Sequence, residues 1–386
     1  MTEHAMSDLA RILSLHHPPT LVFGDGCADQ LRGWLASRGA TRPFVLTAPA
    51  TRAIADALLS DIASAAIWNG ISGEPGLRTL HEALAVARSH DADTIVGIGG
   101  GSVLDVAKVV AALRDSDQTP EQIIGIGNLR TRRTPLVCLP TTAGTGSEVS
   151  PNAILLDEAA SLKKGIISPH LVPDAAFVDP LLTHSVPPAV TAATGIDALV
   201  HCIEAYANRR AHPMVDLYAL EGIRRIHRSL RRAVARGHDA DARRDVAFGS
   251  LLGGLCLGPV NTGAVHALAY PLGSEFGIAH GVSNAVMLCE VLAYNLPAAP
   301  DRYADIAIAL GITRTDADMQ TAARGLDRLR TLCIECGMPT RIHELGIPRD
   351  ALPRMAASAI TIRRLLDLNV RELSLDDAIS IYERAY

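Results

Sequence analysis

The spacing of apolar residues changes character along this chain of 386 residues. In the first half, short apolar runs alternate with longer Ala-rich segments in which apolar residues recur at helical spacing. Strands that alternate with helices predict βαβ units and a mainly parallel sheet covered by helices on both faces. The runs that we interpret as strands are Thr20 to Gly24, Phe44 to Ala48, Thr94 to Ile98 and Pro135 to Leu139.

The second half has few β-branched runs and consists of long amphipathic segments rich in Ala and Leu, as helical bundles require. The change follows the prolines at Pro180, Pro187 and Pro188, and we place the boundary near Val186. A chain of this length also exceeds the usual size of one core. We therefore expect an α/β domain over residues 1–186 and a helical domain over residues 187–386.

One helical segment of the second half carries a dense group of positive charges. Six arginines lie between Arg224 and Arg236, but Ile223, Ile226 and Leu230 keep an apolar stripe at helical spacing beneath them. We interpret this run as the solvated face of a helix rather than as a nucleic-acid patch.

Composition narrows the range of partners. A formal net charge of -5 gives no global attraction to nucleic acid or to an anionic membrane surface. No apolar stretch reaches the roughly 18 residues of a spanning helix, and the first residues do not read as a secretory signal. We expect a soluble, cytoplasmic protein that acts on a small molecule.

The cysteines do not indicate a disulfide framework, because seven of them are scattered through a large chain. Cys333 and Cys336 form a C-x-x-C, but no second pair and no nearby histidine accompany it. We interpret both as partly buried thiols of a helix rather than as zinc ligands or a redox pair.

A glycine-rich loop follows the strand predicted at Thr94 to Ile98, and it consists of Gly99, Gly100, Gly101 and Ser102. Three successive glycines let the backbone approach a diphosphate, whose charge is attracted by free N–H groups and by the dipole of the helix that follows. A tight connection between a strand and a helix would use similar glycines, so this loop by itself does not decide between the two.

A second polar segment favours the nucleotide interpretation. Residues 140–148 read Pro-Thr-Thr-Ala-Gly-Thr-Gly-Ser-Glu and follow the strand predicted at Pro135 to Leu139. Because parallel strands end at one edge of a sheet, Thr141, Thr142 and Thr145 are expected near the glycine loop. Their hydroxyls can bond phosphate, ribose or the nicotinamide amide. The glycine spacing is not G-x-G-x-x-G, which predicts a dinucleotide fold other than the Rossmann type.

Four side chains of the second half have the chemistry of metal ligands. Asp197 and His201 stand four residues apart on a predicted helix and therefore share one face. His266 lies in another helical segment, and His280 follows a glycine-bearing turn. Each histidine alone is more simply an ordinary core or surface imidazole. Together, one carboxylate and three neutral imidazoles suit Fe²⁺, Zn²⁺ or a similar divalent ion, with positions left for substrate.

At this point the chain resembles the iron-containing, or group III, alcohol dehydrogenase family, nearly from end to end. Five motifs carry the resemblance: Gly-Ile-Gly-Gly-Gly-Ser-Val-Leu-Asp-Val-Ala-Lys (97–108), Pro-Thr-Thr-Ala-Gly-Thr-Gly-Ser-Glu-Val (140–149), Gly-Ile-Asp-Ala-Leu-Val-His-Cys-Ile-Glu (195–204), Val-His-Ala-Leu-Ala-Tyr-Pro-Leu-Gly (265–273) and His-Gly-Val-Ser-Asn-Ala (280–285). The order and spacing of these motifs make a chance match improbable.

The resemblance implies a dehydroquinate synthase-like fold, hydride transfer between NAD or NADP and a small alcohol or carbonyl substrate, and a homodimer or larger assembly. The bound metal, iron in the family, would polarise the substrate oxygen. The implied metal ligands are Asp197, His201, His266 and His280. The residues implied to hold or lie near the dinucleotide are Gly99, Gly100, Gly101, Ser102, Asp105, Thr141, Thr142, Thr145 and Lys163.

Two positions depart from the family's pattern. Members often carry a second histidine four residues after the third ligand, where this chain has Tyr270, so Tyr270 becomes a candidate for the path of the proton. Members that prefer NAD often have an acidic residue after the second strand to bond the ribose 2′-OH, whereas this chain has Ala48 and, further on, Arg52. The sequence therefore does not choose between NAD and NADP.

Three alternatives stay open beside a metal-dependent alcohol dehydrogenase. Maleylacetate reductases, a related branch, typically lack the aspartate of the metal motif, so Asp197 argues against them. A lyase of the dehydroquinate synthase type would share the fold but would produce no net NAD(P)H. A catalytically silent metal- or nucleotide-binding protein is suggested by Tyr270 in the place of a histidine.

Overall fold

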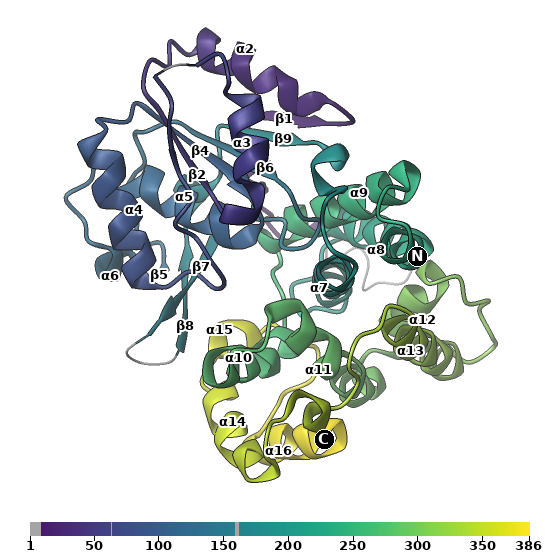
Figure 1. Ribbon diagram of the computed structural model, residues 1–386. Coiled ribbons are helices and arrows are strands. Elements are labelled where there is room, and N and C mark those ends of the chain that lie inside the picture. Colours follow the sequence, from purple (N-terminus) through teal and green to yellow (C-terminus); the bar gives the residue numbers. More distant parts are fainter. Residues whose placement is uncertain (1–8, 63, 159–161) are drawn as a thin grey trace. The chain divides into compact units, whose positions relative to one another are not determined.

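The computed structural model describes residues 9–62, 64–158 and 162–386, and its ribbon is drawn in Figure 1. The chain divides into two compact units. One is His16–Val186, and the other is Pro187–Tyr386 together with residues 9–15. Arg11 fastens this N-terminal stretch to the second unit, because its guanidinium donates to the carbonyls of Arg210 and Ala211.

The first unit is built on a six-stranded sheet whose strands all run parallel, in the order β1-β9-β6-β4-β2-β3. All four strands predicted from the apolar runs are present, and β3 and β9 complete the sheet. The strands are β1 (Thr20–Phe23), β2 (Pro43–Thr47), β3 (Ala66–Trp68), β4 (Thr94–Gly99), β6 (Leu136–Pro140) and β9 (Ala175–Val178). A smaller sheet consists of β5 (Gly125–Ile126), β8 (Leu162–Ile167) and β7 (Asn152–Asp157).

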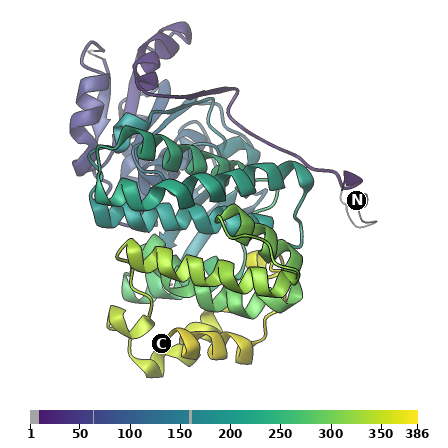
Figure 2. The same ribbon diagram turned by 90° about the vertical axis from the view of Figure 1, so that its right-hand side faces the viewer.

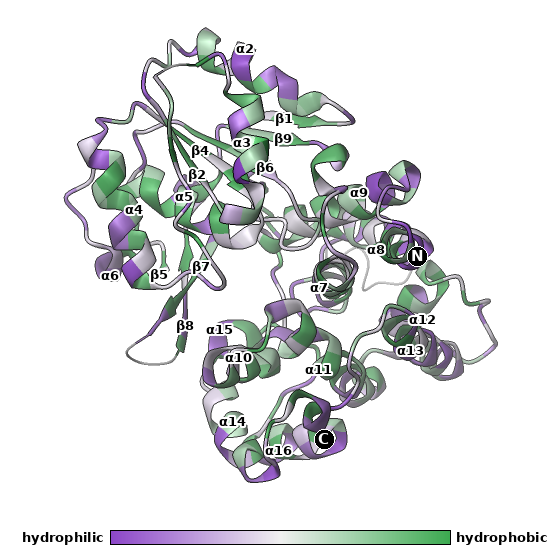
Figure 3. Cartoon of the chain, in the orientation of Figure 1, coloured by the Kyte–Doolittle hydropathy of each residue, from purple (hydrophilic) through white to green (hydrophobic). Residues whose placement is uncertain are grey.

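Helices cover both faces of the six-stranded sheet (Figure 1). Successive residues of a strand point to opposite faces, and in β2 Phe44 and Leu46 belong to one apolar core whereas Val45 belongs to the other. Figure 3 shows β2, β4 and β6 mostly in the green of apolar residues, as expected for strands buried on both faces. The helices are α4 (Leu77–Ser89) and α5 (Gly101–Leu113) on one face and α2 (Gln30–Ser37) and α3 (Arg52–Leu58) on the other.

The second unit is built of helices, so the predicted combination of a parallel-sheet domain and a helical domain is confirmed. In Figure 2 the teal and green helices α8 and α9 lie side by side, as do α12 and α13 further along the chain. The helices are α7 (Pro188–Tyr206), α8 (Pro213–Ala235), α9 (Ala240–Leu257), α10 (Ala264–Phe276), α11 (His280–Asn295), α12 (Pro300–Ala309), α13 (Asp318–Glu335), α14 (Leu352–Ala359), α15 (Arg363–Leu366) and α16 (Leu375–Ala385).

Short helices complete both units. They are α6 (Pro120–Ile123) and the 3-10 helices η1 (Cys27–Asp29), η2 (Pro49–Thr51), η3 (Pro169–Leu171), η4 (Pro180–Thr183), η5 (Leu296–Ala298), η6 (Ile342–Leu345) and η7 (Arg349–Ala351). Among the described residues, no helix combines the length and the apolar character needed to cross a membrane.

The arginine run lies on α8, and the structure confirms that it is a solvated face. Arg225 and Arg228 form ion pairs with Asp245 of α9, and Arg232 forms one with Asp239. The apolar stripe on the other side of the helix is buried. These arginines therefore serve the packing of α8 against α9.

The C-x-x-C lies at the end of α13, where both thiols are buried and free. Burial raises the pKa of Cys336 to about 11 and raises that of Cys333 further. Thiols with raised pKa values are poor nucleophiles and poor metal ligands at neutral pH. The interpretation of this pair as buried helix thiols is confirmed.

Helix α7 is buried nearly all round, and glycines let its neighbours come close. A Cβ at Gly195 would lie 2.2 Å from Cδ1 of Leu230 on α8. Where α7 contacts α11, the neighbouring atom belongs to the backbone. A Cβ at Gly281 of α11 would lie 2.1 Å from the carbonyl oxygen of Ala193 on α7. A side-chain rotation cannot relieve that clash, so Gly281 fixes how closely α11 approaches α7.

We predict that Gly281→Ala destabilises the protein by about 1–3 kcal/mol, because an added methyl group must push α11 away from α7. Chemical denaturation followed by circular dichroism measures the change in the free energy of unfolding. Gly33→Ala on α2 is the matched control, because a Cβ there has no neighbour within 4 Å and alanine favours a helix. Equal stabilities of the two variants would contradict the constraint.

Candidate functional site

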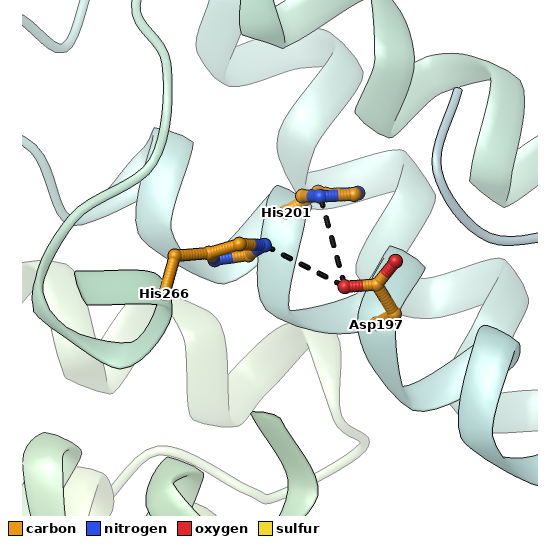
Figure 4. A group of neighbouring side chains, drawn as sticks. All are labelled: Asp197, His201 and His266. Atoms are coloured by element: carbon orange, nitrogen blue, oxygen red, sulfur yellow. Dashed lines mark ion pairs between the residues drawn. The ribbon is translucent and has the colours of Figure 1, made fainter. Parts of the chain in front are cut away.

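Helix α7 presents a carboxylate and an imidazole on one face, one turn apart. Oδ1 of Asp197 lies 3.8 Å from Nε2 of His201, and both side chains are buried. Figure 4 shows them pointing toward a common space together with His266. The predicted shared face of these two residues is thus present.

Two further imidazoles reach the same carboxylate oxygen from other helices. Nε2 of His266 on α10 and Nε2 of His280, the first residue of α11, each lie 3.5 Å from Oδ1 of Asp197. The side chain of His280 is 28% exposed, whereas the other three are buried. The four side chains predicted from sequence therefore converge on one point, and solvent reaches the group at His280.

The electrostatics of this group favour a cation. Burial by itself raises the pKa of Asp197, but His201 and His280 outweigh it and hold the pKa well below its ordinary value. Burial by itself lowers the pKa of His266, yet Asp197 and Glu204 outweigh it and raise the pKa to about 10. A buried carboxylate that stays ionised needs positive charge beside it. Ligand atoms of Asp197, His201 and His266 lie within 4.8 Å of one another, so these residues could hold a metal ion.

A second carboxylate orients His266. One oxygen of Glu204 lies 2.6 Å from Nδ1 of His266, and the other accepts a hydrogen bond from the backbone N–H of Val265. When Nδ1–H donates to Glu204, Nε2 keeps its lone pair for a metal. Sequence reasoning missed Glu204, although its place seven residues after Asp197 puts it on the same face of α7.

An amide also enters the group. Nδ2 of Asn284, one turn after His280 on α11, lies 2.7 Å from Oδ1 of Asp197 and 3.3 Å from Nε2 of both His266 and His280. Its oxygen is buried and has no hydrogen-bond partner among the described residues. Since an amide can turn either its donor or its acceptor toward a neighbour, the oxygen suits a bound cation. Sequence reasoning missed Asn284 too, although it stands four residues after His280.

Tyr270 stands at the edge of the four ligands, one turn after His266 on α10. Its ring centroid lies 6.0 Å from that of His280, at a tilted angle. Nη2 of Arg364 on α15 donates to the phenol oxygen at 2.8 Å. The side chain suspected from sequence thus lies beside the ligands, and Arg364 had no signal in the sequence.

In the first unit, β4 and β6 are neighbours in the sheet, so the loops that follow them meet. The backbone N–H of Thr141 donates to the carbonyl of Gly99 at 2.9 Å. A Cβ at Gly101 would lie 2.4 Å from Cγ2 of Thr145. A Cβ at Gly100 would lie 3.2 Å from Oγ1 of Thr142. The expected proximity of the two loops is confirmed, and their contact with a dinucleotide stays a prediction.

Helix α5 begins on the glycine loop and also holds the second loop. Gly101 is its first residue and Ser102, partly exposed, follows, so the N-terminal end of the helix adjoins the loop. Deeper in α5, Nζ of the fully buried Lys108 donates to the carbonyls of Ser150 and Asn152 at 2.9 and 2.8 Å. The second loop and the start of β7 are thereby fastened to α5.

Two residues expected near the dinucleotide are engaged within the protein. Asp105 accepts hydrogen bonds from Oγ of Ser147 at 2.5 Å and from the backbone N–H of Ile154 at 2.9 Å. Nζ of Lys163 on β8 lies 2.5 Å from Oε1 of Glu74, and its side chain is 6% exposed. In this structure Asp105 braces the second loop, and Lys163 braces the smaller sheet.

Both halves of the chain match models of one family. Residues 18–180 match the model described as iron-containing alcohol dehydrogenase, and residues 191–386 match that of the Fe-containing alcohol dehydrogenase family, C-terminal. Together the two matches span most of the chain.

Individual proteins agree with the family models. Long-chain-alcohol dehydrogenase 1 of Geobacillus thermodenitrificans is 40% identical over 96% of this chain and 95% of its own length. The crystal structure of a 1,3-propanediol oxidoreductase matches with a TM-score of 0.93 and 32% identity, over 97% of this chain and 100% of that chain. A sulfoacetaldehyde reductase of Bifidobacterium kashiwanohense, solved with NAD+, matches with a TM-score of 0.88 and 27% identity, over 97% of this chain and 99% of that chain.

The fold, the four converging side chains and these matches lead to one conclusion: the chain belongs to the iron-containing alcohol dehydrogenase family, whose members are alcohol and aldehyde oxidoreductases.

Proposed function

We propose that this protein is a metal-dependent alcohol dehydrogenase that, in reverse, reduces an aldehyde or ketone. It would transfer hydride between a small alcohol and a nicotinamide dinucleotide. The observation that carries the proposal is the convergence of three imidazole Nε2 atoms on one buried oxygen of Asp197. The presence of that aspartate also argues against a maleylacetate reductase.

The donor set fits a divalent ion, and we propose iron. The residues that would hold it are Asp197, His201, His266 and His280. One carboxylate and three imidazoles accept either Fe²⁺ or Zn²⁺, and the family name favours iron. When bound, the ion supplies Lewis acidity that polarises an alcohol or carbonyl oxygen.

The chain's own side chains would prepare the site for that chemistry. Glu204 holds the ring of His266 in one tautomer and keeps its Nε2 directed at Asp197. The partial exposure of His280 leaves a side open from which a substrate can approach. Tyr270 is our candidate for handling the hydroxyl proton, because a phenol both donates and accepts and this one stands beside His280.

For the dinucleotide we propose the glycine loop and the threonine hydroxyls, with NAD preferred. Among residues 48–58, which follow β2, Arg52 is the one arginine. Its Nε lies 2.8 Å from Oδ1 of Asp56. That carboxylate weakens any attraction of Arg52 for the 2′-phosphate of NADP. The sulfoacetaldehyde reductase of similar structure was solved with NAD+. A homodimer or larger assembly and a cytoplasmic location stay predictions.

We predict that oxidation of short primary alcohols by the protein loaded with Fe²⁺ or Zn²⁺ produces NADH, and that metal stripping abolishes it. Asp197→Asn should lower both the metal content and kcat/KM at least about 100-fold, because a charged ligand is lost from a buried site. Absorbance at the NAD(P)H band, with NAD and with NADP, measures the rate, and elemental analysis measures the metal. Asp350→Asn, at an exposed position, is the control.

Other results would overturn this function in distinct ways. Full activity of Asp197→Asn after metal stripping would exclude the metal centre. Turnover of a substrate with no net NAD(P)H would favour a lyase of the dehydroquinate synthase type. Dinucleotide and metal binding without turnover of any alcohol or aldehyde would favour a silent binding protein.

We predict that Glu204→Gln weakens metal binding about 10- to 100-fold, because the amide no longer fixes the tautomer of His266. A competition titration against a chromogenic chelator gives the affinity. Glu290→Gln on α11, whose carboxylate pairs with Arg330 instead, should leave the affinity unchanged. Equal metal affinities of Glu204→Gln and the unmodified protein would contradict the assigned role.

A further inference from the structure

The side of α10 that carries His266 also carries Tyr270, and this phenol connects the metal ligands to α15. Tyr270 is nearly buried, with its ring 6.0 Å from that of His280. Tyr270 stands one turn after His266, so its phenol borders the group of ligands. The group that lies there is the guanidinium of Arg364.

Arg364 is held in two ways. Its Nη2 donates to the phenol oxygen of Tyr270 at 2.8 Å, and its Cζ lies 5.6 Å from the centroid of the same ring. Both contacts are with a neutral side chain. Arg364 is partly buried, so the guanidinium has given up part of its hydration without receiving an anion in return.

Neighbouring arginines have carboxylate partners. Arg363, the residue before, pairs with Asp367, and Arg354 of α14 pairs with Glu275 of α10. Within the described part of the chain, no carboxylate forms an ion pair with Arg364. The guanidinium is therefore oriented by the protein but is not neutralised by it.

The charge balance of the site makes this guanidinium significant. Around a divalent ion, Asp197 and Glu204 would supply two negative charges, and the imidazoles would be neutral. The ion, its ligands and Glu204 together would then carry no net charge. Arg364 adds one positive charge at the phenol that stands beside His280.

We propose that Arg364, held by Tyr270, binds a carboxylate of the substrate, so that this enzyme acts on alcohols or aldehydes that carry an acid group on the same chain. A planar guanidinium matches a carboxylate through two parallel hydrogen bonds. The inference rests on the proposed alcohol dehydrogenase activity and deepens it by naming the substrate class.

The test compares each acid with its own amide, which keeps the shape and removes the charge. The substrates are ω-hydroxy acids of three to six carbons and the corresponding ω-hydroxy amides, oxidised by the metal-loaded protein with NAD. For the acid whose length lets its hydroxyl lie at the metal and its carboxylate at Arg364, kcat/KM is expected to be about 10- to 100-fold higher than for the amide of the same length. A ratio near one at every length would overturn the proposal, and this measurement needs no variant.

Variants separate binding from packing. Arg364→Met should bring the ratio of kcat/KM for acid over amide close to one, mainly by raising KM for the acid. Because Arg364 also donates to Tyr270, a fall in kcat that acid and amide share does not enter this ratio. Arg364→Lys, which keeps the charge, should retain part of the preference. Arg363→Met on the same helix is the matched control and should leave the ratio unchanged. An equal loss on acid and amide in Arg364→Met would show a merely structural role and overturn the proposal.

A binding measurement tests the subsite independently of turnover. Butyrate and butyramide are titrated calorimetrically into the metal-loaded protein and into metal-loaded Arg364→Met. Butyrate is expected to bind at least about tenfold more tightly than butyramide to the unmodified protein, and to lose this preference in Arg364→Met. If no alcohol is oxidised but butyrate is preferred, the proposed function fails and the anion subsite stands. If neutral alcohols are oxidised and butyrate is not preferred, the activity stands and the subsite fails.

Discussion

The structure of the helical unit depends on a carboxylate that is buried yet ionised. Asp197 is almost without solvent, and its charge is tolerated because three imidazoles and an amide surround it. Removing such a charge from water costs several kcal/mol unless a positive charge is supplied. The unit therefore has to place positive charge or a cation beside this oxygen.

Packing meets the requirement by bringing three helices together at one point. The four side chains come from α7, α10 and α11, and they meet only if the helix axes are close. Gly281, the residue after the ligand His280, permits that approach because no side chain separates α11 from the carbonyl of Ala193. Glu204 then fixes the ring of His266 from behind. The same residues thus serve the packing and the site.

In the α/β unit the corresponding feature is the close meeting of two loops. Glycines bring two loops together after neighbouring strands, and Lys108 ties the second loop to the helix that follows the first. Asp105 and Lys163 take part through contacts within the protein. Polar residues around such loops therefore divide into those that build the loops and those that remain available for a ligand.

The sequence by itself determined the features that depend on local spacing. Apolar runs of strand length indicated four strands, and the separation of Asp197 and His201 by one helical turn placed both on one face. Residues near each other along the chain are near in space whatever the rest of the fold does. The family motifs extended this to all four side chains that converge at Asp197.

Only the tertiary structure decided which faces meet. It inserted β9 between β1 and β6, brought Asn284 to Asp197, and set Arg364 against a tyrosine 94 residues away. These contacts have no local periodicity, because they arise where elements distant in the chain pack together. A helix shows in its sequence which side is apolar, but its neighbour is chosen by the packing of the whole unit.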